Sequence, residues 1–229
     1  MGASSGIGRE VAKLLLADGW ILGVAARRVD KLQNLGANYV ARIDVTSDDA
    51  DTELRNLITK MDGIDLYFHV AGVGKQNHEL TPEIELSTFK TNGLGFARMI
   101  GEAYRYFAGK GKGQIACITS IAGTKGLGPA PSYSATKAMQ NVYIQALEQQ
   151  AYKRNMNIRF TDIRPGFVDT DLLNDQYSYP MKLRPEAVAH DIVRAIYKKK
   201  HIKVIDWKWC IVTALWRRIP CWIWRRMRL

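Results

Sequence analysis

The sequence has few cysteines and no long apolar run, and each absence excludes a class of protein. Its three cysteines, Cys117, Cys210 and Cys221, lack the spacing of a metal site and are a poor number for a disulfide framework. We therefore expect a reduced, cytoplasmic protein that binds no metal. No apolar run approaches the ~20 residues that span a bilayer, so we expect neither a transmembrane helix nor a secretory leader.

Net positive charge is small over most of the chain and concentrated at one end. Residues 198–229 contain ten Lys or Arg and a single acid, Asp206, and carry +9 of the formal net charge of +11. The preceding 197 residues carry only +2. The body of the chain therefore needs no polyanionic partner, and we expect no nucleic acid to bind it.

Apolar runs of strand length alternate with segments of helical period, in a chain of 229 residues that is 47% apolar. The expected strands are 21–26, 64–70, 115–119, 158–163 and 202–205, and the expected helices follow residue 6 and cover 47–61, the region of 96–107, 132–154 and 185–198. Strands separated by helices predict an α/β fold with a doubly wound parallel sheet. We expect one domain, residues 1–206, followed by a basic tail, residues 207–229.

A glycine-rich segment, Gly2-Ala3-Ser4-Ser5-Gly6-Ile7-Gly8, opens the chain. Glycines let the backbone approach a pyrophosphate, and the helix that follows offers free N–H groups and its positive dipole end. A plain glycine-rich turn is the alternative. Met1 stands where a central strand should end, so we expect this first strand, and hence a few upstream residues, to be missing.

The charges after the next expected strand bear on the choice of cofactor. The strand ends in Ala25-Ala26-Arg27-Arg28, without the acid that usually binds the ribose 2′-hydroxyl of NAD. An arginine suits a 2′-phosphate, which favours NADP(H) over NAD(H), unless both arginines are solvated loop charges. Asp44, followed by Val45, is a candidate to bind the adenine amino group, or else a cap or turn residue.

A tyrosine and a lysine one helical turn apart form the candidate catalytic pair. Tyr133 and Lys137 lie on the same face of the helix expected over 132–154. An ammonium beside a phenol should lower the phenol pKa from about 10, so that Tyr133 can exchange a proton with a carbonyl near neutral pH. Ser120 ends the preceding strand, where ligands gather in parallel sheets.

These motifs in this order resemble the short-chain dehydrogenase/reductase family, from Gly2 to about Thr170 and more weakly to about Lys198. The matching positions are Gly2, Gly6 and Gly8 in the glycine motif, Asp44, Asn92, Ser120, Tyr133 and Lys137, and Pro165 to Thr170 in the Pro-Gly segment. The resemblance implies a Rossmann-type fold and an NAD(P)(H)-dependent oxidoreductase. Its substrate would be a small ketone, aldehyde or alcohol.

The resemblance also implies a role for each residue. Tyr133 would exchange the proton, Lys137 would lower its pKa and bind the nicotinamide ribose, Ser120 would hold the substrate oxygen, and Asn92 would hold a water that links Lys137 to solvent. The nicotinamide carboxamide would lie near Val168 and Thr170. The expected cofactor-binding residues are Gly2, Ser4, Ser5, Gly6, Ile7, Gly8, Arg27, Arg28, Asp44, Val45, Ala71, Gly72, Tyr133, Lys137, Pro165, Gly166, Val168 and Thr170.

The sequence departs from the family pattern at two places. Met1 replaces a threonine, and the Asn-Asn-Ala-Gly motif reads His69-Val70-Ala71-Gly72. Ala71 and Gly72 keep the small residues beside the cofactor, whereas the two amides that tie neighbouring strands are lost. We interpret His69 as a core histidine rather than a catalytic one.

The tail, residues 207–229, contains five tryptophans and does not match the family ending. Tryptophan beside arginine suits a membrane interface with anionic lipid. Packing on the body or on a second subunit is the alternative, with nucleic acid a third. By the same resemblance, the segment of about 171–184 would cover the substrate. Its aromatic and apolar residues suggest an apolar or lipid-like substrate, or packing for stability alone. By resemblance we expect a homo-oligomer. A non-catalytic NADP(H) sensor or membrane scaffold is the alternative to an enzyme.

Overall fold

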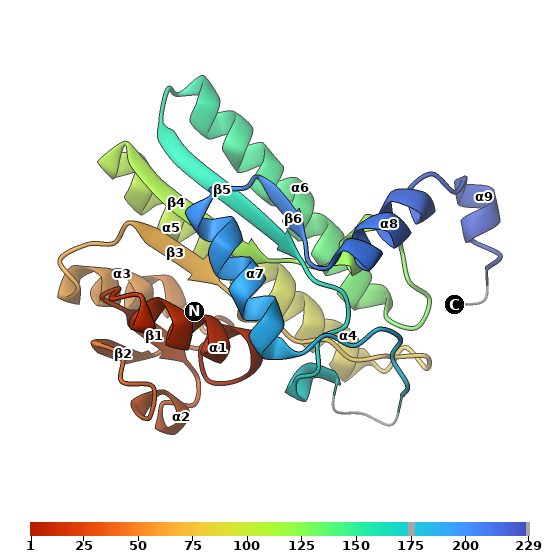
Figure 1. The fold of residues 1–229 in the computed structure, drawn as a ribbon, viewed down its shortest axis with the longest axis horizontal. Coiled ribbons are helices and arrows are strands. Elements are labelled where there is room, and N and C mark those ends of the chain that lie inside the picture. Colours follow the sequence, from red (N-terminus) through yellow and green to blue (C-terminus); the bar gives the residue numbers. More distant parts are fainter. Residues whose placement is uncertain (174–176, 228–229) are drawn as a thin grey trace.

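Within the described residues of the computed structural model, 1–173 and 177–227, six parallel strands form the central layer of the molecule (Figure 1). They belong to two hydrogen-bonded sheets. β1 (Gly23–Ala26) pairs with β2 (Tyr39–Arg42), and β3 (Leu66–His69), β4 (Lys112–Ile118), β5 (Asn157–Arg164) and β6 (Ile202–Val204) pair in that order. The parallel register brings the carboxyl ends of the strands to one edge.

The first two residues join the two sheets at that edge. The Met1 amine donates to the Phe68 carbonyl at 2.8 Å, the Val70 N–H donates to the Met1 carbonyl at 3.0 Å, and the Gly2 N–H donates to the Ala25 carbonyl at 2.7 Å. Below this junction a cleft of about 380 Å³ separates β1 from β3. The cleft lies where the sequence analysis places a further central strand.

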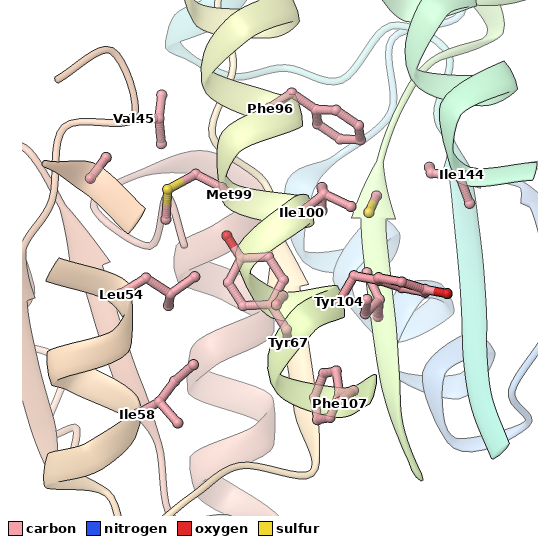
Figure 2. Packing of buried hydrophobic residues seen from close by; sticks show 14 of the residues in the cluster. Val45, Leu54, Ile58, Tyr67, Phe96, Met99, Ile100, Tyr104, Phe107 and Ile144 are labelled. Carbon is pink, nitrogen blue, oxygen red and sulfur yellow. The ribbon is translucent and has the colours of Figure 1, made fainter. Parts of the chain in front are cut away.

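Helices cover both faces of the strands, as expected for a doubly wound fold. One face carries α3 (Ala50–Lys60), α5 (Phe96–Lys110) and α6 (Pro131–Lys153), and the other carries α1 (Gly6–Ala17) and α7 (Pro185–Tyr197). Figure 2 shows the larger core, in which Leu54 and Ile58 of α3 face Met99, Ile100 and Phe107 of α5. Burial of these side chains fixes the helices that carry the site.

Element boundaries differ from the sequence prediction where side chains bond locally. The helix expected from residue 47 begins at Ala50, because Thr46 donates through its N–H and its hydroxyl to the Asp44 carboxylate at 3.0 and 2.8 Å and so forms a turn. The N-cap position of α3 is Asp49. The short helices α2 (Asp30–Gln33) and α4 (Pro82–Thr88) were not predicted.

The chain between α4 and α5 forms a π-helix, η1 (Phe89–Gly95). Single π-helical turns inside α-helices are rare and often occur at functional sites. Two 3₁₀ turns, η2 (Ile121–Thr124) and η3 (Asp171–Leu173), follow β4 and the segment after β5. η1 and η2 each place a candidate site residue.

The tail forms two helices, α8 (Trp207–Trp216) and α9 (Cys221–Trp224), at one end of the molecule (right side of Figure 1). Pro220 divides them, because its ring cannot continue a helix. Of the helices in 1–173 and 177–227, none is long and apolar enough to cross a membrane. The predicted substrate cover, 171–184, and the predicted tail extend over 174–176 and 228–229, which lie outside the described residues.

Candidate active site

Tyr133 and Lys137 lie one turn apart near the start of α6, beside the carboxyl end of β4. Lys137 is buried with 5% of its surface exposed, and Tyr133 is half-buried. The Lys137 Nζ atom lies 5.6 Å from the centre of the Tyr133 ring. The buried residue Ser120 follows β4 and caps η2, where its Oγ accepts a hydrogen bond from the Ala122 N–H at 3.1 Å. Its own hydroxyl proton is therefore available to a second partner, and the Tyr133 hydroxyl is within its reach.

The ammonium of Lys137 has two hydrogen-bond acceptors in the protein. It donates to the Ile118 carbonyl at 3.1 Å and to Oε1 of Gln140 at 3.1 Å. Burial lowers the pKa of Lys137 from 10.5 to about 8, although the nearby Asp162 opposes this shift. Lys137 is therefore mostly protonated at neutral pH.

The pKa of Tyr133 moves in the direction opposite to the sequence prediction. Burial raises the pKa above the usual 10, and a hydrogen bond with the Ser120 hydroxyl lowers it in part. The Lys137 ammonium lies over the ring and bonds elsewhere, so it does not outweigh burial. The corrected expectation is a phenol that stays protonated at neutral pH.

Asn92, at the centre of η1, is fully buried and binds the loop after β3 through hydrogen bonds. Its Oδ1 accepts from the Val73 N–H at 2.9 Å, and its Nδ2 donates to the Val73 carbonyl at 2.6 Å and lies 3.4 Å from the Thr136 hydroxyl. Its backbone carbonyl accepts from Nε2 of Gln140 at 2.8 Å. The side chain of Gln140 thus joins Lys137 to the backbone of Asn92.

Sequence reasoning missed Gln140, whose only signal was a polar residue on the inward face of α6. It also missed Gly74. A Cβ atom on Gly74 would lie 2.7 Å from the Tyr133 ring, and one on Gly72 would lie 3.2 Å from Oδ1 of Asn92. These glycines let the loop after β3 pass close to the candidate catalytic side chains.

The glycine turn has the geometry of a cradle. Gly2 has φ +89° and lies against the Ala71 backbone, where a Cβ atom would approach the Ala71 nitrogen to 2.7 Å. A Cβ atom on Gly8 would lie 2.2 Å from the Gly2 carbonyl oxygen. α1 begins at Gly6, and no side chain caps its first N–H groups. The turn therefore fits a pyrophosphate, because backbone and dipole are both available to an anion.

The two arginines after β1 lie at the edge of this cradle, and both are exposed. The Arg28 guanidinium lies 3.5 Å from the Ser4 hydroxyl and 3.4 Å from the Ser5 hydroxyl. Burial raises the pKa of Asp44, but the hydrogen bonds from Thr46 and the charges of Arg27 and Lys90 lower it overall. Asp44 is thus ionised, half-buried and engaged in the turn that precedes α3.

The segment from Pro165 to Thr170 faces the glycine turn. A Cβ atom on Gly6 would touch Thr170 Cγ2 at 3.1 Å. The segment is held by Leu183, whose N–H donates to the Phe167 carbonyl and whose carbonyl accepts from the Asp169 N–H, both at 2.9 Å. On its outer side the indole of Trp209 covers Gly166, where a Cβ atom would lie 2.2 Å from the indole nitrogen.

The structure also bears on two predictions about packing, one for His69 and one for the segment 171–184. Burial lowers the pKa of His69 to about 3, and its ring bonds through Nδ1 to the Tyr67 hydroxyl at 3.0 Å and packs edge-on against Phe96. His69 is a neutral core residue. In the expected substrate cover, the Tyr179 ring packs on Phe167 at 4.9 Å between centroids. Packing thus accounts for at least this aromatic side chain.

The tail packs on the body through one side of α8 and through α9. Trp209 is buried and meets the Phe167 ring edge-on at 5.4 Å. The indole N–H of Trp216 donates to the Thr124 hydroxyl at 2.8 Å, and that of Trp224 donates to the Gly126 carbonyl at 2.7 Å. The tail therefore packs against two segments beside the site. These are the Pro-Gly segment, 165–170, and the loop that follows Ser120.

The comparisons with known proteins agree with this geometry. The sequence model of the family described as short chain dehydrogenase matches residues 1–179. The chain is 32% identical over 208 residues to an uncharacterised oxidoreductase of Myxococcus xanthus, covering 86% of this chain and 80% of the relative. It is 29% identical over 213 residues to one of Staphylococcus haemolyticus, covering 89% and 91%.

Solved structures share the fold. An alcohol dehydrogenase of the archaeon Thermococcus sibiricus, in complex with 5-hydroxy-NADP, superposes with a TM-score of 0.78 at 24% identity and covers 89% of this chain and 93% of its own. A 3-ketoacyl-(acyl-carrier-protein) reductase of Brucella melitensis, in complex with NADH, gives a TM-score of 0.78 at 21% identity, covering 90% and 94%. The predicted Rossmann-type α/β fold is confirmed.

Proposed function

Since this chain belongs to the short chain dehydrogenase family of oxidoreductases, we propose that it reduces a ketone or aldehyde to an alcohol with NADPH, or catalyses the reverse reaction. The observation that carries the proposal is the clustering of Tyr133, Lys137 and Asn92 beside the glycine turn. Gly72 lies against Asn92 and Lys137, while its neighbour Ala71 touches Gly2.

The residues present fit a nicotinamide dinucleotide. The turn from Gly2 to Gly8 would hold the pyrophosphate, and the segment from Pro165 to Thr170 would hold the nicotinamide end. When bound, the cofactor supplies or takes up a hydride. In the reduction, the carbonyl carbon accepts that hydride and the carbonyl oxygen accepts the Tyr133 proton.

The chain's own groups supply the proton and the positive charge. Because the pKa of Tyr133 lies above 10, its hydroxyl carries a proton at neutral pH and suits a donor. The Ser120 hydroxyl would donate to the same substrate oxygen and hold it beside Tyr133. The Lys137 ammonium would stabilise negative charge as it develops on the Tyr133 oxygen.

A preference for NADP(H) is supported by the position of Arg28. Its guanidinium reaches the hydroxyls of Ser4 and Ser5, so a 2′-phosphate placed there would meet one positive charge and two hydroxyl donors. The Thermococcus relative holds an NADP derivative and the Brucella relative holds NADH. The preference for NADP(H) therefore rests on Arg28 and Arg27 rather than on the relatives.

The substrate class is a small carbonyl compound or the corresponding alcohol. A relative of 28% identity over 182 residues, covering 76% of each chain, is a 3-oxoacyl-[acyl-carrier-protein] reductase of Bos taurus. Leu172, Tyr177 and Met181 are partly exposed in the segment after β5. Both observations favour an apolar or lipid-like substrate.

We also propose a cytoplasmic homo-oligomer with peripheral contact between its tail and the inner membrane surface. The cysteines of the described residues are free thiols, which suits a reducing compartment. Leu94, Met139 and Val142 are exposed on η1 and α6, and an oligomer would cover them. Sedimentation velocity of Val142→Asp against the wild type tests the oligomer, and an unchanged sedimentation coefficient would contradict it.

The enzyme proposal is tested by NADPH consumption with a panel of ketones and aldehydes that includes long-chain 3-keto compounds, with NADH in parallel. We expect turnover that prefers NADPH and falls by about 10²–10⁴-fold in Tyr133→Phe, the contribution typical of a general acid. NADPH binding without turnover on any compound would favour a non-catalytic sensor or scaffold instead.

A further inference from the structure

The helix α8 is apolar on the face that it buries and also on the face that it presents to water. Its buried and half-buried side is Trp209, Val212, Thr213 and Trp216. The opposite side exposes Trp207 by 67%, Ile211 by 51% and Leu215 by 62%. These three residues are spaced by four, so they form one stripe. Lys208 is the one charged residue of α8, and a helix with so few polar residues is normally covered on most of its sides.

The second tail helix, which follows α8 directly, also exposes apolar side chains. Trp222 of α9 is 65% exposed and Ile223 is 38% exposed. We define the docking surface as Trp207, Ile211, Leu215, Trp222, Ile223 and the arginines 217, 218, 225 and 226. All four arginines are exposed, and no acid within the described ranges lies in ion-pair distance of them. The surface thus combines uncovered apolar side chains with unpaired positive charge.

The surface is rigidly attached to the body. The Lys125 ammonium donates to the Ile219 carbonyl at 2.9 Å, between α8 and α9, and lies 5.7 Å from the Trp224 ring. The rings of Trp216 and Trp224 meet edge-on at 5.7 Å. These contacts hold Trp216 and Trp224 against the body, whereas Trp207 and Trp222 are exposed.

We propose that this docking surface binds the surface of an anionic lipid bilayer. Exposed indoles suit the headgroup depth of a membrane, arginines bind lipid phosphates, and isoleucine and leucine enter the acyl boundary. A polyanion such as RNA would use the arginines but not the aliphatic stripe. α8 has ten residues, so it is about 15 Å long and lies in the interface rather than crossing it.

The chain provides a matched control for charge. Lys198, Lys199 and Lys200 belong to the same basic stretch but precede β6, which runs parallel to β5. They therefore lie at the amino edge of the sheet, whereas α8 begins at its carboxyl edge. Neutralising Lys198, Lys199 and Lys200 changes the net charge as much as neutralising three tail arginines. The charge is then removed at the opposite edge of the sheet.

The experiment is flotation of the full chain with vesicles of phosphatidylcholine, alone and mixed with phosphatidylglycerol. We expect binding only to the mixed vesicles and less at high salt. Arg217→Gln/Arg225→Gln/Arg226→Gln should reduce the bound fraction at least tenfold, and Lys198→Gln/Lys199→Gln/Lys200→Gln should retain it. Equal loss in both triple variants, or no binding of the wild type, would overturn the proposal.

The apolar stripe is tested separately. Ile211→Asp/Leu215→Asp should abolish flotation, whereas Tyr152→Asp, at an 85% exposed site on α6, should not. Both variants should keep wild-type far-UV circular dichroism and the wild-type sedimentation coefficient. If Ile211→Asp/Leu215→Asp splits an oligomer while flotation persists, a second copy covers the stripe and the proposal fails. Flotation requires no substrate, so its result is independent of the proposed reaction.

A separate observation concerns Gln140, which has no solvent exposure. Its amide accepts from Lys137 Nζ at 3.1 Å and donates to the Asn92 carbonyl at 2.8 Å. We infer that Gln140 is a positioning residue for the proposed reaction, because it orients the lysine ammonium and supplies a neutral acceptor. This inference rests on the proposed role of Lys137.

The test compares Gln140→Glu with Gln114→Glu. Gln114 is also buried and bonds the Thr161 hydroxyl and the Ile196 carbonyl, away from the site. A carboxylate beside Lys137 should raise the lysine pKa, so Gln140→Glu should move the alkaline limb of kcat/KM upward by about one pH unit or more. Gln114→Glu should lower Tm without moving that limb. An unmoved limb in both would contradict the inference, whereas no turnover in the wild type would instead refute the proposed function.

Discussion

Gly74 lies against the ring of Tyr133, where a Cβ atom would approach the ring carbon Cε2 to 2.7 Å. The loop after β3 can pass this close only because position 74 has no side chain. The position of the Tyr133 hydroxyl therefore depends on a residue in another part of the fold.

We predict that Gly74→Ala lowers kcat. The new methyl group must push the Tyr133 ring or the loop aside, and a displacement near 1 Å costs about 10²-fold in rate. The matched control is Gly109→Ala in α5, where no atom lies within 4 Å of the new Cβ. Steady-state kinetics with NADPH measures both, and wild-type activity in Gly74→Ala would show that the ring has room to adapt.

The cofactor preference should depend on Arg28. Replacement by serine removes the charge next to the Ser4 and Ser5 hydroxyls, so KM for NADPH should rise by about tenfold or more while KM for NADH changes little. Lys31→Ser, in the neighbouring helix α2, removes the same charge and serves as the control. A parallel rise of both KM values in Arg28→Ser would assign the residue to folding or to the pyrophosphate.

The buried ammonium of Lys137 should make stability depend on pH. Its pKa is about 8 in the folded protein and near 10.5 when unfolded, so between these values the unfolded chain binds more protons and folding stability rises with pH. Lys137→Met lacks this dependence and should be stabilised relative to the wild type at pH 7, by less at pH 9. Urea unfolding at both pH values measures the difference, which would stay constant if the ammonium were solvated.

Two tryptophans of α8 that are two residues apart should contribute very differently to the free energy of unfolding. Trp209 is 4% exposed against Gly166 and Phe167, so Trp209→Ala should lower the free energy of unfolding by about 3–5 kcal/mol. Trp207 is 67% exposed, and Trp207→Ala should change it by less than about 0.5 kcal/mol. Denaturant unfolding of the pair decides whether the tail is an integral part of the domain. Similar values for both variants would mean that the tail detaches before unfolding.

Much of the fold and of the candidate site follows from local patterns. The alternation of short apolar runs with longer amphipathic helices predicts the parallel sheet, because runs of this length suit strands that are covered on both faces. The four-residue spacing of Tyr133 and Lys137 places both side chains on one face of the predicted helix. His69 was assigned to the core from its apolar surroundings, and its Tyr67 and Phe96 contacts agree.

Other features required the tertiary structure, because they depend on distances between segments far apart in the chain. The rise in the Tyr133 pKa comes from burial among residues of several elements, which helical spacing cannot show. The amide of Gln140 reaches the Asn92 backbone only because α6 packs on η1. The tail composition left packing and membrane contact open. The structure shows that one side of α8 packs on the body, since Trp209 is buried, while Trp207 on another side remains exposed to solvent.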